Sequence, residues 1–253
     1  MLIKKFNAAI VACICLIPAF TFADGLTDLK NALAKEQGKS AIKATFEIKS
    51  WNRQGEEKSM EERSGAATIS IEDNQQGLQL HFSRELLNKL EAEQRAKEKD
   101  HQAKTPSTDA AAAINTKVVQ QMTSAASLVT GLLEKGEFKN ERVDTFGGKP
   151  ARVINLIFNQ DKLSPKEREH LKKYAGSAEI WIADDGTPLA YRSREIITAS
   201  FMMLVSFDVT NEENGTFALA GNRLILTHQE SKDKGSGLGQ KGEGSTIKTL
   251  QIL

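Results

Sequence analysis

Four histidines, one glycine-rich run and one pair of aspartates are the residues of this chain whose types could support catalysis or metal binding. The histidines stand far apart in the sequence, at His81, His101, His170 and His228. None belongs to an HExxH motif or to another metal-ligand spacing, and metal ligands normally occur in clusters. We therefore interpret them as solvent-exposed side chains and predict neither a metal site nor a catalytic residue.

The glycine-rich run over residues 237–242 matches the pattern GxGxxG. A dinucleotide site requires a strand before this motif and a helix after it, so that the helix N-terminus meets the phosphates. Because a strand is expected to follow the run, we interpret residues 235–244 as a Gly-rich hairpin loop. The pair Asp184-Asp185, followed by Gly186, lacks the spacing of a calcium loop and predicts a turn. We expect no cofactor.

The first 23 residues have the three parts of a cleavable secretory signal peptide. Lys4 and Lys5 precede a mostly apolar run over 6–20, and small residues stand at the two positions that a signal peptidase reads. The apolar run is too short for a spanning helix. A retained membrane anchor and a lipoprotein acylated at Cys13 are the alternatives. We expect an exported, periplasmic protein that consists of residues 24–253.

Cysteine content and charge exclude several kinds of site and partner for residues 24–253. Both cysteines, Cys13 and Cys15, lie in the signal, so the rest can form no disulfide, zinc–thiolate site or cysteine nucleophile. The signal contains two of the 34 basic residues and none of the 33 acidic ones. This near-neutral balance provides no long-range attraction for nucleic acid. No later apolar run reaches the length of a membrane span.

Most of residues 24–253 alternate apolar and polar side chains, which is the pattern of half-buried strands. Runs of this kind cover 45–51, 67–71, 78–82, 178–182 and 201–209. Turn residues are expected to separate strands at 73–77, 184–188 and 211–215, and the charged stretch 52–65 is also expected to be turn-like. Helical spacing predicts one helix over 26–38 and a short one over about 164–174.

A period of 3.6 residues replaces the alternation between residues 83 and 135. Ser83 is a suitable N-cap for a first, highly charged helix. A polar linker over 104–109 leads to a second helix, whose apolar stripe ends before Gly136. The stripe contains Ile114, Val118, Met122, Ala125, Val129 and Leu132. We therefore predict a helical hairpin over 83–135, inserted into a single α+β domain with one strongly curved antiparallel sheet.

Three short segments carry a family resemblance: the strand start at 44–46, the Gly-Gly-Lys-Pro turn at 147–150, and the Asp-Gly-Thr-Pro turn at 185–188. With the order of elements, they resemble the periplasmic lipoprotein-carrier superfamily. That superfamily includes the carrier, its outer-membrane receptor and related regulators of envelope-stress sigma factors. The resemblance implies a half-open β-barrel around an apolar cavity, helices that act as a lid, and acyl chains or lipoproteins as ligands.

The apolar stripes of the strands and of the second helix are the candidate lining of such a cavity, and ordinary core packing is the alternative interpretation. The ligand-cavity candidates are Phe46, Ile48, Leu78, Leu80, Phe82, Val118, Met122, Val129, Phe201, Met203, Val205 and Phe207.

Three functions remain open at this point. The first is a non-enzymatic periplasmic carrier that binds a lipid or lipoprotein ligand in the apolar concavity, in the service of lipoprotein transport or outer-membrane biogenesis. The second is an envelope interaction or sensor protein of the same fold without lipid cargo, which docks a protein partner through the charged arm over 85–104. The third is a hydrolase that uses His81 or His228, although no nucleophile–base pattern is present. The first hypothesis requires an apolar hollow between sheet and helices.

Overall fold

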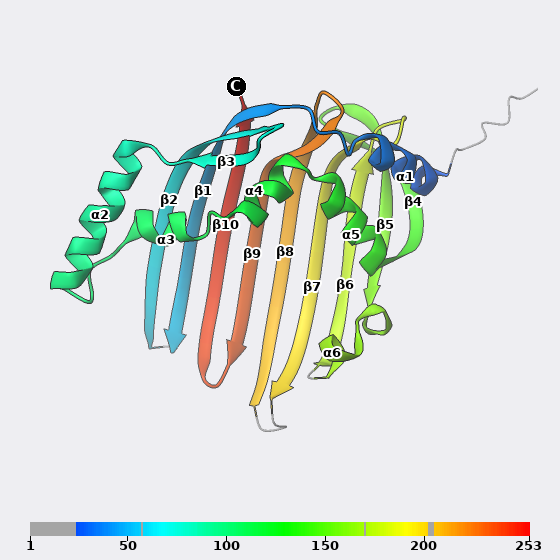
Figure 1. Cartoon of the computed structure of the whole chain (residues 1–253). Helices are drawn as coiled ribbons and strands as arrows, with labels where there is room; N and C mark the ends of the chain where they lie inside the picture. The colour runs from blue at the N-terminus through cyan, green and yellow to red at the C-terminus, as the bar shows by residue number, and fades with distance from the viewer. Residues whose placement is uncertain (1–23, 57, 170, 202–204) are drawn as a thin grey trace, which may run out of the picture.

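The computed structural model describes residues 24–253 except 57, 170 and 202–204. In this part of the chain ten strands form one sheet, in the order β3-β2-β1-β10-β9-β8-β7-β6-β5-β4, which curves without closing (Figure 1). Every neighbouring pair is antiparallel. The strands are β1 (Ile42–Glu56), β2 (Ser59–Asn74), β3 (Gly77–His81), β4 (Gly136–Phe146), β5 (Lys149–Asn159), β6 (Leu171–Ile182), β7 (Pro188–Phe201), β8 (Val205–Ala220), β9 (Arg223–Gly237) and β10 (Gln240–Ile252).

The two edge strands, β3 and β4, follow each other in the sequence, so the chain between them must cross the whole sheet. This connection contains α2 (Arg84–Lys99), α3 (Pro106–Ala112), α4 (Thr116–Thr123) and α5 (Ala126–Lys135). In Figure 1, α3, α4 and α5 run across one face of the sheet, whereas α2 stands beyond the β2 edge. We call residues 106–135 the strap, and the face that it crosses the concave face.

The main core lies where the strap and α1 (Gly25–Lys35) cover the concave face. Alternate residues of β1 are buried there, while Lys43 and Lys49 on the other face are exposed. The strap contributes Val119, Met122 and Val129, each fully buried. Because each such side chain stabilises the fold by about 1.5–3 kcal/mol when buried, the strap is an integral part of the core.

The strap approaches β2 most closely at Gly65. A Cβ atom at this position would overlap the carbonyl oxygen of Pro106 and would contact Ala110. The absence of a side chain on β2 therefore allows α3 to lie directly against the sheet. Two further short helices, η1 (Gln160–Lys162) and α6 (Pro165–Arg168), follow β5.

The predicted α+β fold with a strongly curved, open antiparallel sheet is confirmed. The turn residues at 73–77 do separate β2 from β3, and those at 184–188 separate β6 from β7. Ser83 caps α2, because its hydroxyl accepts a hydrogen bond from the amide of Leu86 at 3.1 Å. Gly136 ends α5 as expected. The predicted signal peptide, together with Cys13, lies outside the described residues.

The predicted second helix of the insert is divided into three, so the insert is not a helical hairpin. Asn115 starts α4, since its side chain accepts a hydrogen bond from the amide of Val118 at 3.0 Å. The break after α4 is fixed by β9: the Arg223 guanidinium donates to the Ser124 hydroxyl at 2.9 Å, and the amide of Ala125 donates to the carbonyl of Leu224 at 2.9 Å. Tertiary contacts thus override the helical period.

Four other sequence predictions differ from the structure. Residues 52–56 continue β1, 59–65 begin β2, and 211–215 belong to β8; 235–244 belongs to β9 and β10 except for a two-residue turn at Leu238-Gly239. The helix expected to reach residue 174 ends at Arg168, where β6 soon follows. In the distal halves of β1, β2, β9 and β10 both faces of the sheet meet solvent, so the apolar alternation stops while the ladder of backbone hydrogen bonds continues.

In the described residues, every helix is too short or too polar to traverse a lipid bilayer.

Candidate binding face

The concave face divides into a zone under the strap and a distal zone beyond it. Along β1 the buried side chains end at Ile48, and Ser50, Asn52, Gln54 and Glu56 continue on the same face. In β10 the register places Lys248 beside Ile48 and Gly242 beside Gln54. The change from apolar to polar or small residues therefore occurs at Lys248 in β10 and one residue pair further along, at Ser50, in β1.

The zone under the strap is packed solid around the candidates that it contains. Phe46, Ile48, Met122 and Val129 have exposed fractions of 0 % and belong to one core cluster. Four further candidates are partly buried against that cluster, namely Leu78, Leu80, Phe82 and Val118. Eight of the twelve cavity candidates thus lie together, but they pack against one another in the core and line no open cavity in this conformation.

The remaining candidates come from β7, β8 and the residues between these two strands. Phe207 is partly buried and lies in the distal zone. Met203 lies outside the described residues, as do the side chains of Phe201 and Val205.

A row of hydrogen-bonded polar side chains crosses the concave face at the boundary of the two zones. Lys248 donates to the Gln229 side chain at 3.0 Å, and Gln229 donates to the Tyr191 hydroxyl at 2.7 Å. Tyr191 in turn donates to Glu213 at 3.3 Å. Burial lowers the pKa of the Lys248 ammonium, although the nearby Glu213 charge opposes that shift. Burial also raises the pKa of the Tyr191 hydroxyl, which therefore stays protonated.

One ion pair and one hydrogen bond from a charged side chain hold the strap on the sheet. At its C-terminal end Lys135 contacts Glu195 of β7 at 2.7 Å. Near its middle, the buried Arg223 joins Ser124 to Asp73 of β2 and to the carbonyl of Ser40. These contacts link the strap to β7 and β9 directly, and to β2 through Arg223.

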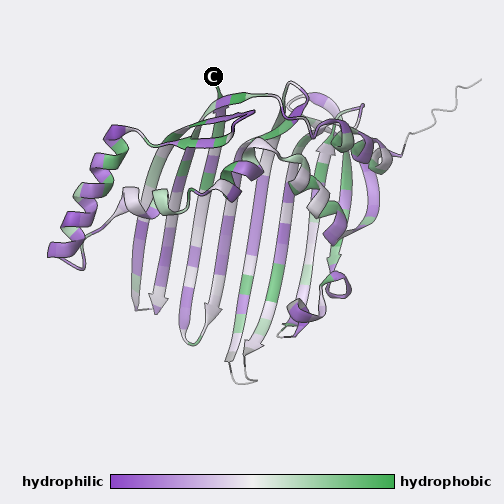
Figure 2. Ribbon diagram, viewed as in Figure 1, coloured by the Kyte–Doolittle hydropathy of each residue, from purple (hydrophilic) through white to green (hydrophobic). Residues whose placement is uncertain are grey.

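The distal zone contains an open trough of about 870 Å³. One wall is apolar and comes from β8, with Phe207 and Val209, and the opposite wall is polar and includes Asn52 and Gln54 of β1. Figure 2 shows the same contrast: green segments lie on the distal halves of β7 and β8, and the neighbouring β9 and β10 are white to purple. The trough can therefore receive a ligand that is apolar on one side only.

Glycines form the floor of this trough. Gly235 of β9 pairs with Gly242 of β10, and Gly237 stands on the same face two residues along β9. Gly244 of β10 is on this face too but outside the trough, where the Asp233 carboxylate lies against it. A Cβ on Gly242 would make only ordinary contacts, and the same holds for Gly235, whereas one on Gly237 would overlap the Phe207 ring. Glycine weakens a strand interior, and it often marks a place where another molecule approaches the backbone closely.

Sequence reasoning missed this floor because it assigned residues 235–244 to a loop. The available signal was the spacing of two residues between Gly235 and Gly237 and again between Gly242 and Gly244, which places each pair on one face of a strand. The GxGxxG match is a by-product of this spacing around a two-residue turn.

The histidines are not brought together. His81 and His101 are exposed, His228 is partly buried in β9, and His170 lies outside the described residues. Among the residues that the structure describes, no group of three or more histidine, cysteine, aspartate or glutamate side chains is arranged to hold a metal ion.

Comparisons with known proteins give a single distant likeness to report. No family model matches the sequence, and no curated protein matches it. A solved structure described as a LolA superfamily protein from Nitrosomonas europaea is similar over 90 % of this chain and 94 % of its own length, with 10 % sequence identity and a TM-score of 0.24. The two chains thus correspond in extent and superpose loosely.

Proposed function

We propose that this chain is a non-catalytic carrier of the bacterial envelope that binds an acyl-bearing ligand in the distal trough of its concave face. The observation that carries the proposal is the glycine floor beside an apolar wall. Gly235 and Gly242 leave bare backbone at the centre of the trough, next to Phe207 and Val209. A methylene chain can lie against such a surface without displacing side chains.

The two unlike walls favour a lipidated peptide over a free lipid. An acyl chain on the β8 side would bury apolar surface, at about 0.8 kcal/mol for each buried CH₂ group. The attached peptide would face Asn52 and Gln54, whose side chains offer both hydrogen-bond donors and acceptors. A free acyl chain has no amide groups with which to hydrogen-bond these side chains.

The strap would serve as a lid over the inner zone. Its helices are short, and α4 and α5 are held by Arg223 and Lys135 at defined points. If these contacts open, the side chains around Phe46 and Ile48 become a continuation of the trough. A chain longer than the trough could then extend towards Met122, which adapts readily to different apolar partners.

The proposal is tested by titrating residues 24–253 with a fluorescein-labelled octapeptide of neutral sequence that carries an N-terminal palmitoyl group. We expect fluorescence anisotropy to report binding at least tenfold tighter than for the same peptide without palmitate. Tenfold corresponds to about 1.4 kcal/mol, or roughly two buried CH₂ groups. Equal affinities for the two peptides would remove the carrier function.

A further inference from the structure

The outer edge of β2 is only partly paired. The strand contains 16 residues, and β3 pairs with Ser70–Asn74 alone. Within the described part of the chain no strand pairs with the β2 edge between residues 59 and 69. The part nearest Gly65 lies against α3, and the end from Met60 to Ser64 is left open.

The direction of the backbone groups along this edge follows from the β2–β3 hairpin. Asn74 and Gly77 flank a two-residue turn, and such a closing pair exchanges both of its backbone hydrogen bonds. Even-numbered residues of β2 therefore direct N–H and C=O groups towards the β3 side. Because the register with β1 continues without a bulge, Met60, Glu62 and Ser64 direct theirs to the open edge.

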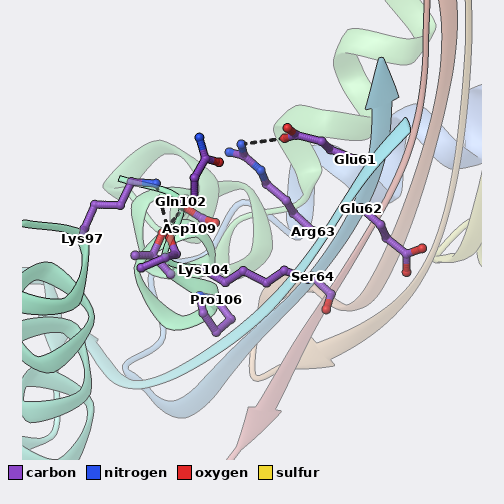
Figure 3. Close-up of a pocket in the computed structure, with 11 residues that line it drawn as sticks. Glu61, Glu62, Arg63, Ser64, Lys97, Gln102, Lys104, Pro106 and Asp109 are labelled. Carbon is purple, nitrogen blue, oxygen red and sulfur yellow. Dashed lines mark hydrogen bonds and ion pairs between the residues drawn. The ribbon is translucent and has the colours of Figure 1, made fainter. Parts of the chain in front are cut away.

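A slot of about 620 Å³ runs along this open edge (Figure 3). Four consecutive residues of β2, Glu61 to Ser64, line one side, so the slot follows the edge of the sheet instead of lying over one face. The connection between α2 and α3 forms the other side, through Gln102, Lys104 and Pro106. Residues 60–64 extend over roughly 14 Å, the length of a short strand.

The second side of the slot is held in place before any ligand arrives. Glu93 of α2 accepts hydrogen bonds from the amides of Ser107 and Thr108 at 2.9 and 2.7 Å, at the start of α3. It also accepts one from the Thr108 hydroxyl at 2.8 Å. Because α2 and α3 are fixed to each other and α3 to Gly65, the width of the slot is set by the fold.

Six charged side chains line the slot, three acidic and three basic. Asp109, one of the acids, accepts a hydrogen bond from the Thr105 hydroxyl at 3.2 Å. Glu61 pairs with Arg63 at 3.1 Å, and Glu62 accepts a hydrogen bond from the Trp51 indole at 2.8 Å. Lys97 donates to the carbonyl of Ala103. Among the described residues no ion pair includes Lys97 or Lys104. The slot can therefore accept a negatively charged side chain.

The opposite edge of the sheet lacks these features. In β4 a bulge falls between Phe138 and Asn140. A bulge is a usual means by which an edge strand is protected from further pairing. The β2 edge is regular over the slot, and the connection between α2 and α3 forms the far wall of the slot.

We propose that the slot binds an extended acidic peptide segment, which adds as a strand to the β2 edge. Its backbone pairs with Met60, Glu62 and Ser64, and its acidic side chain contacts Lys97 or Lys104. This peptide site shares only Glu61 with the lining of the trough, and its test does not depend on acyl binding.

The test uses residues 24–253 and a phage-displayed library of random octapeptides, from which enriched sequences are synthesised with a fluorescent label. The informative pair of variants is Glu62→Pro and Glu62→Ala. Both lose the side chain that contacts Trp51, but only proline also removes the outward N–H, and proline is tolerated where an edge N–H faces solvent. Ser64→Pro and Ser64→Ala form a second pair should Glu62→Pro unfold the protein.

We expect enriched peptides to contain aspartate or glutamate and to bind the Glu62→Ala variant at least tenfold more tightly than Glu62→Pro. Hydrogen exchange measured residue by residue should show new protection at Met60, Glu62 and Ser64 on peptide binding, with little change at Glu61 and Arg63, whose amides already pair with β1. No enrichment, equal affinity of the two variants, or protection without this alternation would overturn the proposal.

Discussion

Lys135, in the last turn of α5, donates hydrogen bonds to both carboxylate oxygens of Glu195 on β7, each at 2.7 Å. Tyr174 donates to the same carboxylate at 3.1 Å, and the Lys135 ammonium lies 5.2 Å from the centroid of the Phe158 ring. A cation at this position also interacts favourably with the C-terminal end of the helix. The contact fastens the end of the strap to the concave face.

Removing this contact should loosen the strap. We expect Lys135→Met to lower the free energy of unfolding by about 1–2 kcal/mol, as for a half-buried charged hydrogen bond. Urea unfolding measures the loss of stability, and faster amide hydrogen exchange in α5 would show that the strap is looser. Lys117→Met, at an exposed position of α4, is the control and should change little. Equal stability of the two variants would mean that Lys135 does not fasten the strap.

The same contact should persist at physiological pH. Burial disfavours the charged form of Lys135, but its bonds to Glu195 and Tyr174 outweigh that effect and raise the pKa above the usual 10.5. The stabilisation is complete below the unfolded-state pKa and is lost only as the pH rises through the higher folded-state value.

Glu36, at the end of α1, should give the protein an unusual dependence of stability on pH. The residue is only 8 % exposed, and one carboxylate oxygen has no hydrogen-bond partner. Burial raises its pKa, the hydroxyl of Thr187 partly offsets this, and the Asp185 charge adds to it. The folded state therefore holds the proton more tightly than the unfolded state.

The contribution of Glu36 to the free energy of unfolding must then fall as the pH rises from about 4.5 through the folded-state pKa. Urea unfolding at a series of pH values, in the parent and in Glu36→Gln, measures this as a difference. We expect the free energy of unfolding of Glu36→Gln, relative to that of the parent, to increase as the pH rises. Glu134→Gln, on the exposed surface of α5, should keep the parent's slope. A difference between Glu36→Gln and the parent that stays constant with pH would contradict the assignment.

The turn between β9 and β10 contains a strained leucine. Leu238 has φ +53 and Gly239 has φ +78, which is the left-handed pair of a two-residue hairpin turn. Leucine is disfavoured in this region by about 1–2 kcal/mol, and its side chain is 71 % exposed, so little burial compensates. We expect Leu238→Asn to raise the free energy of unfolding by about 1 kcal/mol and Leu238→Ala to leave it nearly unchanged. A stability gain that is equal in both variants would rule out relief of strain.

The sequence predicts the inner half of the sheet well because burial there imposes alternation. Phe46 and Ile48 face the core while Glu47 and Lys49 do not, and the register of β1 follows from this pattern. Beyond Ser50 neither face is covered, so nothing in the residue types distinguishes a long strand from a turn. The strand continuation through Asn52 could not be predicted for this reason.

The strap shows a different limit. Its apolar stripe from Ile114 to Leu132 has a regular helical period, and local propensity favours one continuous helix. The break between α4 and α5 comes from Arg223 and Leu224, about 100 residues further along the chain, which bind Ser124 and Ala125. The candidate site was also predicted in the wrong place. The apolar side chains were recognised, but the strap fills the space between them. The open surface lies beyond the strap and is built from glycines.

The most direct test of the trough as an acyl site is to place a large side chain on one of the glycines of its floor. Gly242→Leu adds a side chain where the structure leaves room for one, and Gly131→Leu, on the open side of α5, is a matched substitution outside the trough. With the palmitoylated octapeptide as probe, and with circular dichroism to confirm folding, we expect Gly242→Leu to weaken binding at least tenfold and Gly131→Leu to leave it unchanged. A folded Gly242→Leu protein that binds as tightly as the parent would show that the acyl chain lies elsewhere.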